Sequence, residues 1–417
     1  MEKLNTVVSF AEICLYGGKP EGLRSHNVPI DASASWEIRN EKELAACFTG
    51  ELPVYARISG SETQKYVENK ICAMETMSMD GGGAKARLHA SGMAAVTSAL
   101  LGATKPGDNI VIIGPVYGGT YDMLKFLKDN GRVVKFFAAR DPELAGKIEK
   151  ELSSCAARIV FGELTCNPTI DVWDVCEVAD ICKRHNSILA VDTSFLSPYN
   201  ARPFEFGADI VVHSSTKYLG GRGAFVSGLS VASPKFLASG SGLAVWEKMN
   251  SFSNCTGATP GVFETWLLGI FMEDLHLRIP TQNANAMALA THLRKHKNVL
   301  GVMYPMISNE ELAEKVIRPA DGGKAYGAML TIRVRGGIDS VKKFLLKMTN
   351  RTYVKHKPSL GYTKTIIESP WILSQAFVSD EDKKLFGITD DLVRISVGTE
   401  STGYILEAFD FGLSEIW

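Results

Sequence analysis

The chain has 417 residues, of which 45% are apolar and 22% are charged, and its formal net charge is −1. This length allows two domains with substantial cores, and the composition is that of a globular protein. The near-zero net charge provides no basic surface for nucleic acid, so we expect no nucleic-acid partner. No apolar run is long enough to span a bilayer, so we expect no membrane partner. The cysteines and histidines lack the spacing of metal ligands, so we expect no metal site.

The first 60 residues or so show little periodic pattern, which favours an extended N-terminal arm (1–60). Its beginning, Met1 to Thr6, lacks the basic and then apolar pattern of a signal peptide. The eight cysteines are scattered, without a Cys-x-x-Cys pair, as is typical of reduced thiols. Both features predict a cytoplasmic protein.

Residues 61–250 alternate helical stretches with short apolar runs, which predicts a mostly parallel sheet flanked by helices. The expected strands are Asn109–Ile113, Val133–Phe137, Ala157–Phe161, Ile188–Val191 and Ile210–Val212. In such a sheet, ligands bind at the carboxyl ends of the strands. Polar residues that follow these runs are therefore candidates for a binding site.

Two such candidates come early in the sheet region. Ser91-Gly92 opens the helical run that ends near Leu101, and a helix N-terminus binds phosphate well, although an ordinary Ser cap explains the same residues. Tyr117 lies on a glycine-rich turn after the Asn109–Ile113 strand. It could stack on a planar ring, or simply pack on a neighbouring helix.

The next two strands end in groups of opposite charge. Asp192 ends the Ile188–Val191 strand, and Lys217 follows the next one after Ser214, Ser215 and Thr216. A lysine there could form a Schiff base with an aldehyde cofactor, hydroxyls could hold its phosphate, and a carboxylate could keep a pyridine nitrogen protonated. A solvated lysine and a turn aspartate are the plainer alternatives, but the pairing on neighbouring strands favours a pyridoxal 5'-phosphate (PLP) site.

A helical stretch, Gly261 to Leu293, leads into a smaller C-terminal α/β domain, so we place the second domain at 251–417. Arg394 lies in an apolar, strand-like run there. A partly buried arginine suits bidentate carboxylate binding, and an ion pair with Asp390 or Asp391 is the alternative.

These segments, taken together, resemble the Cys/Met-metabolism family of PLP enzymes, which includes cystathionine γ-synthase, the cystathionine lyases, methionine γ-lyase and the homoserine sulfhydrylases. The resemblance extends over most of the chain and includes Val28-Pro-Ile30, Tyr55-Ala-Arg57, Glu163-Leu-Thr-Cys-Asn167, Ser359-Leu-Gly361 and Val393-Arg394. Many ordered matches are strong evidence, whereas any single one is weak. The resemblance implies the PLP-dependent transferase fold of fold type I.

The resemblance also implies roles for residues. It places PLP on Lys217, with Asp192 at the ring nitrogen and Tyr117 stacked on the ring and acting as an acid or base. The phosphate would contact Ser91, Gly92, Met93, Ser214 and Thr216, with Tyr55 and Arg57 supplied by a neighbouring subunit of a homotetramer built as a dimer of dimers. The substrate would contact Arg394, Asn167 and Ser359.

Departures from the family pattern bear on the substrate. Arg222 and Ala224 change the charges after Lys217, and Lys364 stands where cystathionine-handling members carry Glu. Two added cations predict poor use of a substrate with a distal ammonium, such as cystathionine, and better use of a neutral or acylated γ-substituted amino acid. They also predict that Lys364→Glu shifts the preference toward cystathionine.

The predicted activity is PLP-dependent γ-elimination on a γ-substituted L-amino acid of the sulfur-amino-acid type, giving a keto acid and ammonia. Two alternatives stay open. One is γ-replacement, as in an O-acylhomoserine sulfhydrylase or cystathionine γ-synthase. The other is a catalytically altered PLP-binding protein, which the presence of Lys217, Asp192, Tyr117 and Arg394 disfavours.

Overall fold

A computed structural model describes residues 8–79, 82–155 and 157–416, and its centre is a seven-stranded sheet in the order β1-β7-β6-β5-β4-β2-β3. Strands β2 to β6 pair in parallel, whereas β7 runs antiparallel to both β6 and β1. The mostly parallel sheet predicted from the sequence is therefore confirmed. Its strands are β1 (Lys85–His89), β2 (Asn109–Gly114), β3 (Val133–Ala138), β4 (Ala157–Glu163), β5 (Ile188–Asp192), β6 (Ile210–His213) and β7 (Gly228–Ala232).

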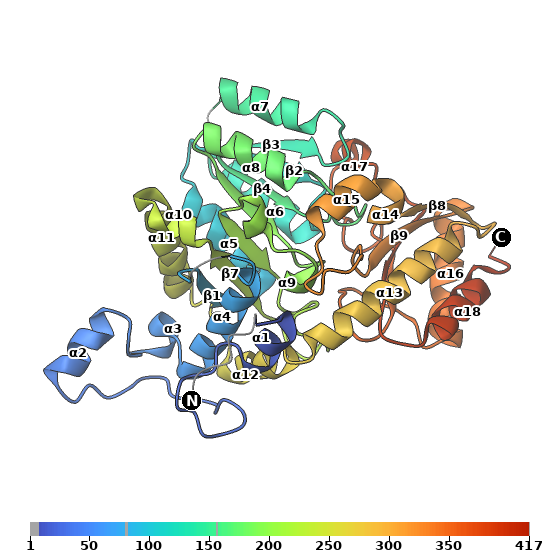
Figure 1. The fold of residues 1–417 in the computed structure, drawn as a ribbon. Helices are drawn as coiled ribbons and strands as arrows, with labels where there is room; N and C mark the ends of the chain where they lie inside the picture. The colour runs from blue at the N-terminus through green and yellow to red at the C-terminus, as the bar shows by residue number, and fades with distance from the viewer. Residues whose placement is uncertain (1–7, 80–81, 156, 417) are drawn as a thin grey trace.

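Both faces of the sheet are buried around its central strands, which explains why β2, β4, β5 and β6 are mostly apolar runs. Successive side chains alternate between two cores: Ile110 and Ile112 belong to one, Val111 and Ile113 to the other. Helices α5, α6 and α11 pack in the first core, and α4, α7 and α8 in the second (Figure 1). The helices of this region are α4 (Glu62–Glu75), α5 (Gly92–Ala103), α6 (Gly118–Asp129), α7 (Leu144–Ser154), α8 (Val175–Arg184), α9 (Ser197–Asn200), α10 (Pro234–Ala238) and α11 (Gly240–Thr256).

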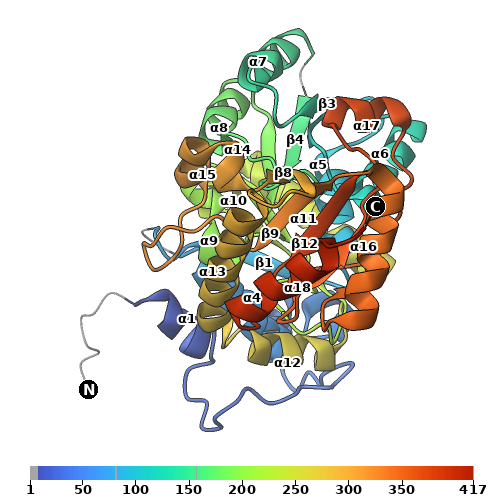
Figure 2. The ribbon, with the colours of Figure 1, turned by 90° about the vertical axis from the view of Figure 1, so that its right-hand side faces the viewer.

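The C-terminal part contains a second, five-stranded sheet in the order β10-β11-β12-β9-β8. Figure 2 shows helices α13, α16 and α18 beside it. Its strands are β8 (Val299–Met303), β9 (Met329–Val334), β10 (Lys355–His356), β11 (Ile366–Glu368) and β12 (Leu392–Ser396). Its helices are α14 (Pro305–Ser308), α15 (Glu310–Val316), α16 (Gly337–Arg351), α17 (Asp380–Phe386) and α18 (Thr402–Leu413).

The link between the two sheets differs in detail from the sequence prediction. The helical stretch expected from Gly261 to Leu293 is two helices, α12 (Val262–Phe271) and α13 (Leu275–Leu293). The boundary that we placed at residue 250 falls inside α11. Strands β1 and β7 were not predicted. Neither is a long apolar run: β1 reads Lys-Ala-Arg-Leu-His at the sheet edge, and β7 is a short segment with Gly and Ser.

The N-terminal arm is only partly anchored to the body. Helix α1 (Phe10–Tyr16) packs on α4 and α13, and α3 (Ala56–Ser59) accepts hydrogen bonds from Arg87 of β1, whereas α2 (Glu41–Phe48) projects away from the sheet, at the lower left of Figure 1. Phe48 is 84% exposed on this projecting part. Such an apolar, outlying segment is typical of an arm that packs on another molecule. The residues Met1 to Thr6, from which we predicted that the chain does not begin with a signal peptide, lie outside the described residues.

Candidate active site

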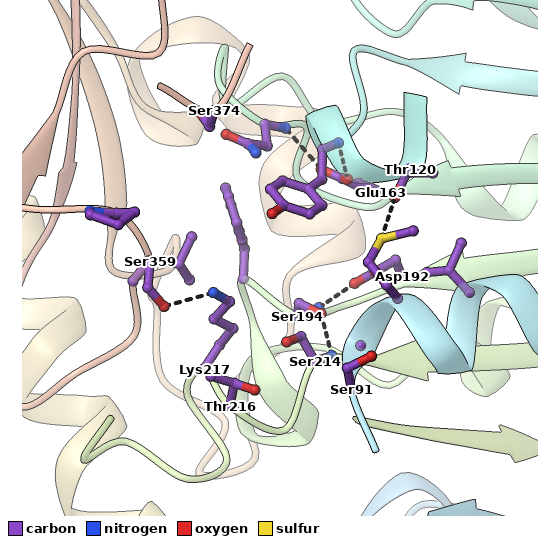
Figure 3. Close-up of a pocket in the computed structure, with 18 of the residues that line it drawn as sticks. Ser91, Thr120, Glu163, Asp192, Ser194, Ser214, Thr216, Lys217, Ser359 and Ser374 are labelled. Carbon is purple, nitrogen blue, oxygen red and sulfur yellow. Dashed lines mark hydrogen bonds between the residues drawn. The ribbon is translucent and has the colours of Figure 1, made fainter. Parts of the chain in front are cut away.

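A cavity of about 550 Å³ lies between the two sheets at the carboxyl ends of the parallel strands. It is lined by most of the residues predicted from the sequence: Ser91, Gly92, Met93, Tyr117, Asn167, Asp192, Ser214, Thr216, Lys217, Ser359 and Arg394. Figure 3 shows the side chains of Lys217, Asp192 and Ser214 approaching it from one sheet, and that of Ser359 from the other side. Parallel strands meet at one edge, which is why residues far apart in the chain gather here.

Lys217 stands in the turn that follows β6, and its Nζ donates a hydrogen bond of 2.7 Å to Ser359 Oγ (Figure 3). Burial and the nearby Arg394 guanidinium lower the pKa of Lys217 to about 8, although Glu368 and Asp192 oppose that shift. A lysine with this pKa carries an appreciable neutral fraction near pH 7, which an acid–base group or a nucleophile requires.

Ser359 has a positive φ of 82°, unusual for a residue other than glycine. Such backbone geometry costs on the order of 1–3 kcal/mol and is often found at functional sites. Here it lets one residue serve two partners: its hydroxyl accepts from Lys217, while its carbonyl accepts from Arg394 at 3.1 Å.

Asp192 ends β5, and its Oδ1 accepts a hydrogen bond of 2.7 Å from the backbone N–H of Ser194. Burial raises the pKa of Asp192, while the hydrogen bonds from Ser194 and the charges of His213 and Lys217 lower it. The neighbouring His213 is buried and bonded through Nε2 to Glu75 Oε1 at 2.5 Å. Asp192 is thus a carboxylate held in a fixed orientation at the floor of the cavity.

A cradle for a phosphate forms where α5 begins. Ser91 caps this helix, with its Oγ accepting from Ala94 N at 3.0 Å. At Gly92 a side chain has no room, because a Cβ there would lie 2.6 Å from Ser214 Cβ. The start of α5 therefore lies directly against Ser214, and its first-turn N–H groups with that hydroxyl form the kind of donor set that a phosphate group needs; Thr216 also lines the cavity.

Tyr117 precedes α6, lines the cavity and is 46% exposed. Its backbone N–H donates to Glu163 Oε1 at 2.6 Å, and the N–H of Asn167 donates to Glu163 Oε2 at 3.0 Å. Burial and the adjacent Asp192 raise the pKa of Glu163 well above its ordinary value. Glu163 thus ties two site loops together. The sequence offered Glu163 only as part of the family match, with no role assigned, although it ends a strand as Asp192 does.

Arg394 lies in β12, and its side chain is only 4% exposed. Its Nη1 donates to Asn167 Oδ1 at 2.8 Å and its Nη2 to the Ser359 carbonyl. Nη2 also lies 2.9 Å from Glu368 Oε2, an acid that the sequence analysis missed. The ion pair considered from the sequence, with Asp390 or Asp391, is not made: Asp391 pairs with Arg333 instead.

Four residues with a role predicted from the sequence lie away from this cavity within the chain. Tyr55 and Arg57 lie on the arm, where Arg57 bonds to the Asn254 carbonyl of α11 and its guanidinium lies 5.5 Å from the centre of the Tyr55 ring. Lys364 is exposed and does not line the cavity. Arg222, which supplied the other added charge, forms an ion pair with Asp274. The charge repulsion expected from Lys364 and Arg222 therefore finds no support in this geometry.

The residues present fit a bound PLP group. Gly92 and the α5 N-terminus leave space and donors for a phosphate, Tyr117 offers an exposed ring face, and Asp192 offers a buried carboxylate beside Lys217. A lysine between parallel strand ends, an acid on the neighbouring strand and a helix N-terminus define a PLP-dependent enzyme of fold type I.

Comparison with known proteins gives the family. The model of the Cys/Met metabolism PLP-dependent enzymes matches residues 14–414, and the chain belongs to this family. It is 33% identical to cystathionine γ-lyase of Saccharomyces cerevisiae over 85% of each chain. It is 32% identical to L-methionine γ-lyase of Treponema denticola over 85% of this chain and 83% of that one.

A solved structure agrees with this assignment. Cystathionine γ-synthase of Xanthomonas oryzae pv. oryzae, in complex with aminoacrylate and cysteine, superposes with a TM-score of 0.85 and 25% identity over 99% of both chains. The family uses PLP, so the cofactor and fold class predicted from the sequence are confirmed. Among the described residues there is no helix long and apolar enough to cross a membrane, and no cluster of side chains suited to a metal ion.

Proposed function

We propose that this enzyme catalyses γ-elimination on a γ-substituted L-amino acid of the sulfur-amino-acid type and releases a keto acid and ammonia. One observation carries the proposal: Ser359 joins the amine of Lys217 and the guanidinium of Arg394 in a single cavity. A substrate held by its carboxylate on Arg394 would have its α-carbon near the lysine amine. This places a proton-transfer group where the first bond must break.

Bound PLP supplies an electron sink that stabilises negative charge on the substrate carbons. Arg394 orients the substrate through its carboxylate, with Asn167 holding the guanidinium in place. Lys217 Nζ removes the proton from the α-carbon and returns protons to the carbon chain. Asp192 keeps the ring nitrogen protonated, because a carboxylate there favours the cationic form.

Tyr117 is the proposed acid for the leaving group, since its ring is exposed at the cavity and its backbone is fixed by Glu163. Proton transfer from its hydroxyl to the γ-substituent lets that group leave as a neutral thiol, or as a carboxylic acid where the substrate is O-acylated. Water then releases the nitrogen as ammonia, and the remaining four-carbon chain becomes a 2-keto acid.

The lyases among the similar proteins, including the two named above, support elimination, whereas the cystathionine γ-synthase supports the alternative of replacement. The test is to incubate the holoenzyme with methionine, cystathionine and O-acetylhomoserine, with and without an added thiol, and to measure ammonia and keto acid. Release without a thiol is the expected result. Product formation that needs an added thiol would favour the γ-replacement reaction of a sulfhydrylase or synthase instead.

The arm supports a proposal about assembly. Tyr55 and Arg57 lie at helix α3 of the arm, with Tyr55 43% exposed, and neither lines the cavity of its own chain. We infer that they complete the phosphate site of a neighbouring subunit in a homotetramer built from two dimers.

The eight cysteines are all free, which agrees with a reducing, cytoplasmic compartment.

Replacing Arg57 by alanine is expected to weaken PLP binding roughly 10- to 100-fold, because a hydrogen bond to a charged group contributes about 1.5–3 kcal/mol. Dialysis followed by cofactor absorbance measures the loss. Arg39→Ala is the matched control, since Arg39 is on the same arm and pairs only locally with Glu43 at 2.7 Å. A fully active monomer in sedimentation at the assay concentration would contradict this prediction.

Lys364→Glu is now expected to change the preference between cystathionine and neutral substrates by about twofold at most. The Lys364 side chain is exposed, and exposed charges are screened by water and salt. Competition assays with cystathionine and methionine measure the ratio. A large shift toward cystathionine would contradict this prediction and would place Lys364 beside the substrate.

A further inference from the structure

Glu368, at the end of β11, contributes an acid to the C-terminal wall of the cavity that none of the proposed steps uses. Its Oε2 lies 2.9 Å from Arg394 Nη2, and the two side chains are 2% and 4% exposed. Its Oε1 accepts a hydrogen bond from Ser374 Oγ. The arginine that we assign to the substrate carboxylate is therefore already paired with a carboxylate of the protein.

The contact is an ion pair rather than an aligned hydrogen bond, because Glu368 Oε2 has no hydrogen-bond partner in the described structure. The guanidinium has five N–H donors, and it donates hydrogen bonds to Asn167 Oδ1 and to the Ser359 carbonyl. N–H donors of Arg394 thus remain for an incoming carboxylate. That carboxylate would bind beside the negative charge of Glu368 in a buried site, where the two charges repel each other strongly.

We propose that Glu368 is an internal counter-ion of Arg394 that a substrate carboxylate must displace, so that it sets the affinity of the site for carboxylates. The proposal rests on the proposed function only in assigning the substrate carboxylate to Arg394. In the free enzyme Glu368 balances the buried guanidinium and holds it in position. When substrate binds, the two carboxylates compete for the same cation.

The displaced charge has a second cation close by. The Glu368 carboxylate opposes the lowering of the pKa of Lys217, which means that it favours the charged form of the Lys217 amine. The other acids that line the cavity, Asp192 and Glu163, accept backbone N–H groups at the strand ends of the first sheet. Glu368 is anchored instead by Ser374, in a run of turns before α17. It is the acid placed to change partners.

The test uses the PLP-loaded enzyme and propionate, a carboxylate without an amine that cannot be turned over. Calorimetric titration of Glu368→Gln is expected to show propionate binding about tenfold tighter than in the parent, because the amide keeps the shape but not the competing charge. Glu368→Gln combined with Arg394→Lys should lose that gain. Equal or weaker binding in Glu368→Gln would overturn the proposal.

Two further variants make the result specific. Asp391→Asn removes an acid from another arginine pair of the same sheet, Arg333–Asp391 at 2.8 Å, and should leave propionate affinity unchanged. Ser374→Ala keeps both charges but frees Glu368, and should tighten propionate binding by less than the glutamine variant does. A weakened affinity in Ser374→Ala would count against the proposal even if Glu368→Gln proved unstable.

A second readout follows the lysine rather than the arginine. In Glu368→Gln the pKa seen in a pH titration of the cofactor absorbance should fall, since the carboxylate that stabilises the cationic lysine nitrogen is gone. An unchanged pKa would show that Glu368 does not interact with Lys217. Neither measurement depends on the reaction catalysed, so failure of γ-elimination in product assays would leave this test intact.

Discussion

Turnover is expected to fall at least about 10²–10⁴-fold when Lys217 is replaced by alanine, which corresponds to roughly 3–5 kcal/mol of barrier. The reason is that Lys217 Nζ is both the attachment point for PLP and the proposed proton-transfer group. The pKa of Lys217, lowered to about 8, gives it the neutral fraction that this role requires. Keto-acid release by the purified variant measures the effect.

Two measurements separate this effect from misfolding. Circular dichroism should be unchanged, because Lys217 makes its side-chain hydrogen bond to Ser359 and does not belong to the core. The visible absorbance of the lysine-linked cofactor, and its loss on borohydride reduction, should disappear in Lys217→Ala. Lys217→Arg keeps the positive charge and should be inactive too. Substantial turnover in the alanine variant would refute the assignment of Lys217.

Much of the sheet and the cofactor side of the site could be predicted from the sequence. The apolar runs that begin at Asn109, Ile188 and Ile210 are buried on both faces, so they stand out as strands without any structure. Because ligands bind at the carboxyl ends of such strands, the sequence alone could assign Asp192 and Lys217 to the same binding site. The structure places both at one cavity.

The substrate side was harder to predict, because it depends on contacts between distant segments. Glu368 lies in a three-residue strand, and nothing local indicates that it pairs with Arg394 of β12. Lys364, only four residues earlier, drew attention because its type departs from the family pattern, yet it is exposed. The type of a residue was visible in the sequence, whereas the direction of its side chain was not.

The arm is a different case, since its contacts within one chain are few. Helix α1 is anchored by Lys70, a fully buried lysine that donates from Nζ to the Cys14 carbonyl at 2.7 Å. Beyond it, Phe48 and Ile58 are exposed on the arm. A sequence can indicate that such a segment lacks its own core, but its place depends on a surface that another subunit provides.

Asp192→Asn is expected to keep PLP bound and to reduce turnover by about 10³-fold. An asparagine Oδ1 can still accept the Ser194 N–H, so the turn after β5 should persist. The lost interaction is that between a carboxylate and a protonated ring nitrogen, which at about 4 Å and an effective dielectric constant near 20 amounts to roughly 4 kcal/mol. A difference of that size in the barrier corresponds to about 10³ in rate.

The matched control is Asp209→Asn in the same sheet. Asp209 precedes β6, and its Oδ2 accepts from Leu189 N at 2.9 Å, so it also bonds to a backbone N–H, but away from the carboxyl ends of the strands. Its replacement should leave turnover close to that of the parent. If Asp192→Asn turned over as fast as Asp209→Asn, the charge of Asp192 would have no part in catalysis, and the residue would serve only to shape the turn. Retained cofactor with lost turnover would show that the carboxylate acts on the chemistry rather than on binding.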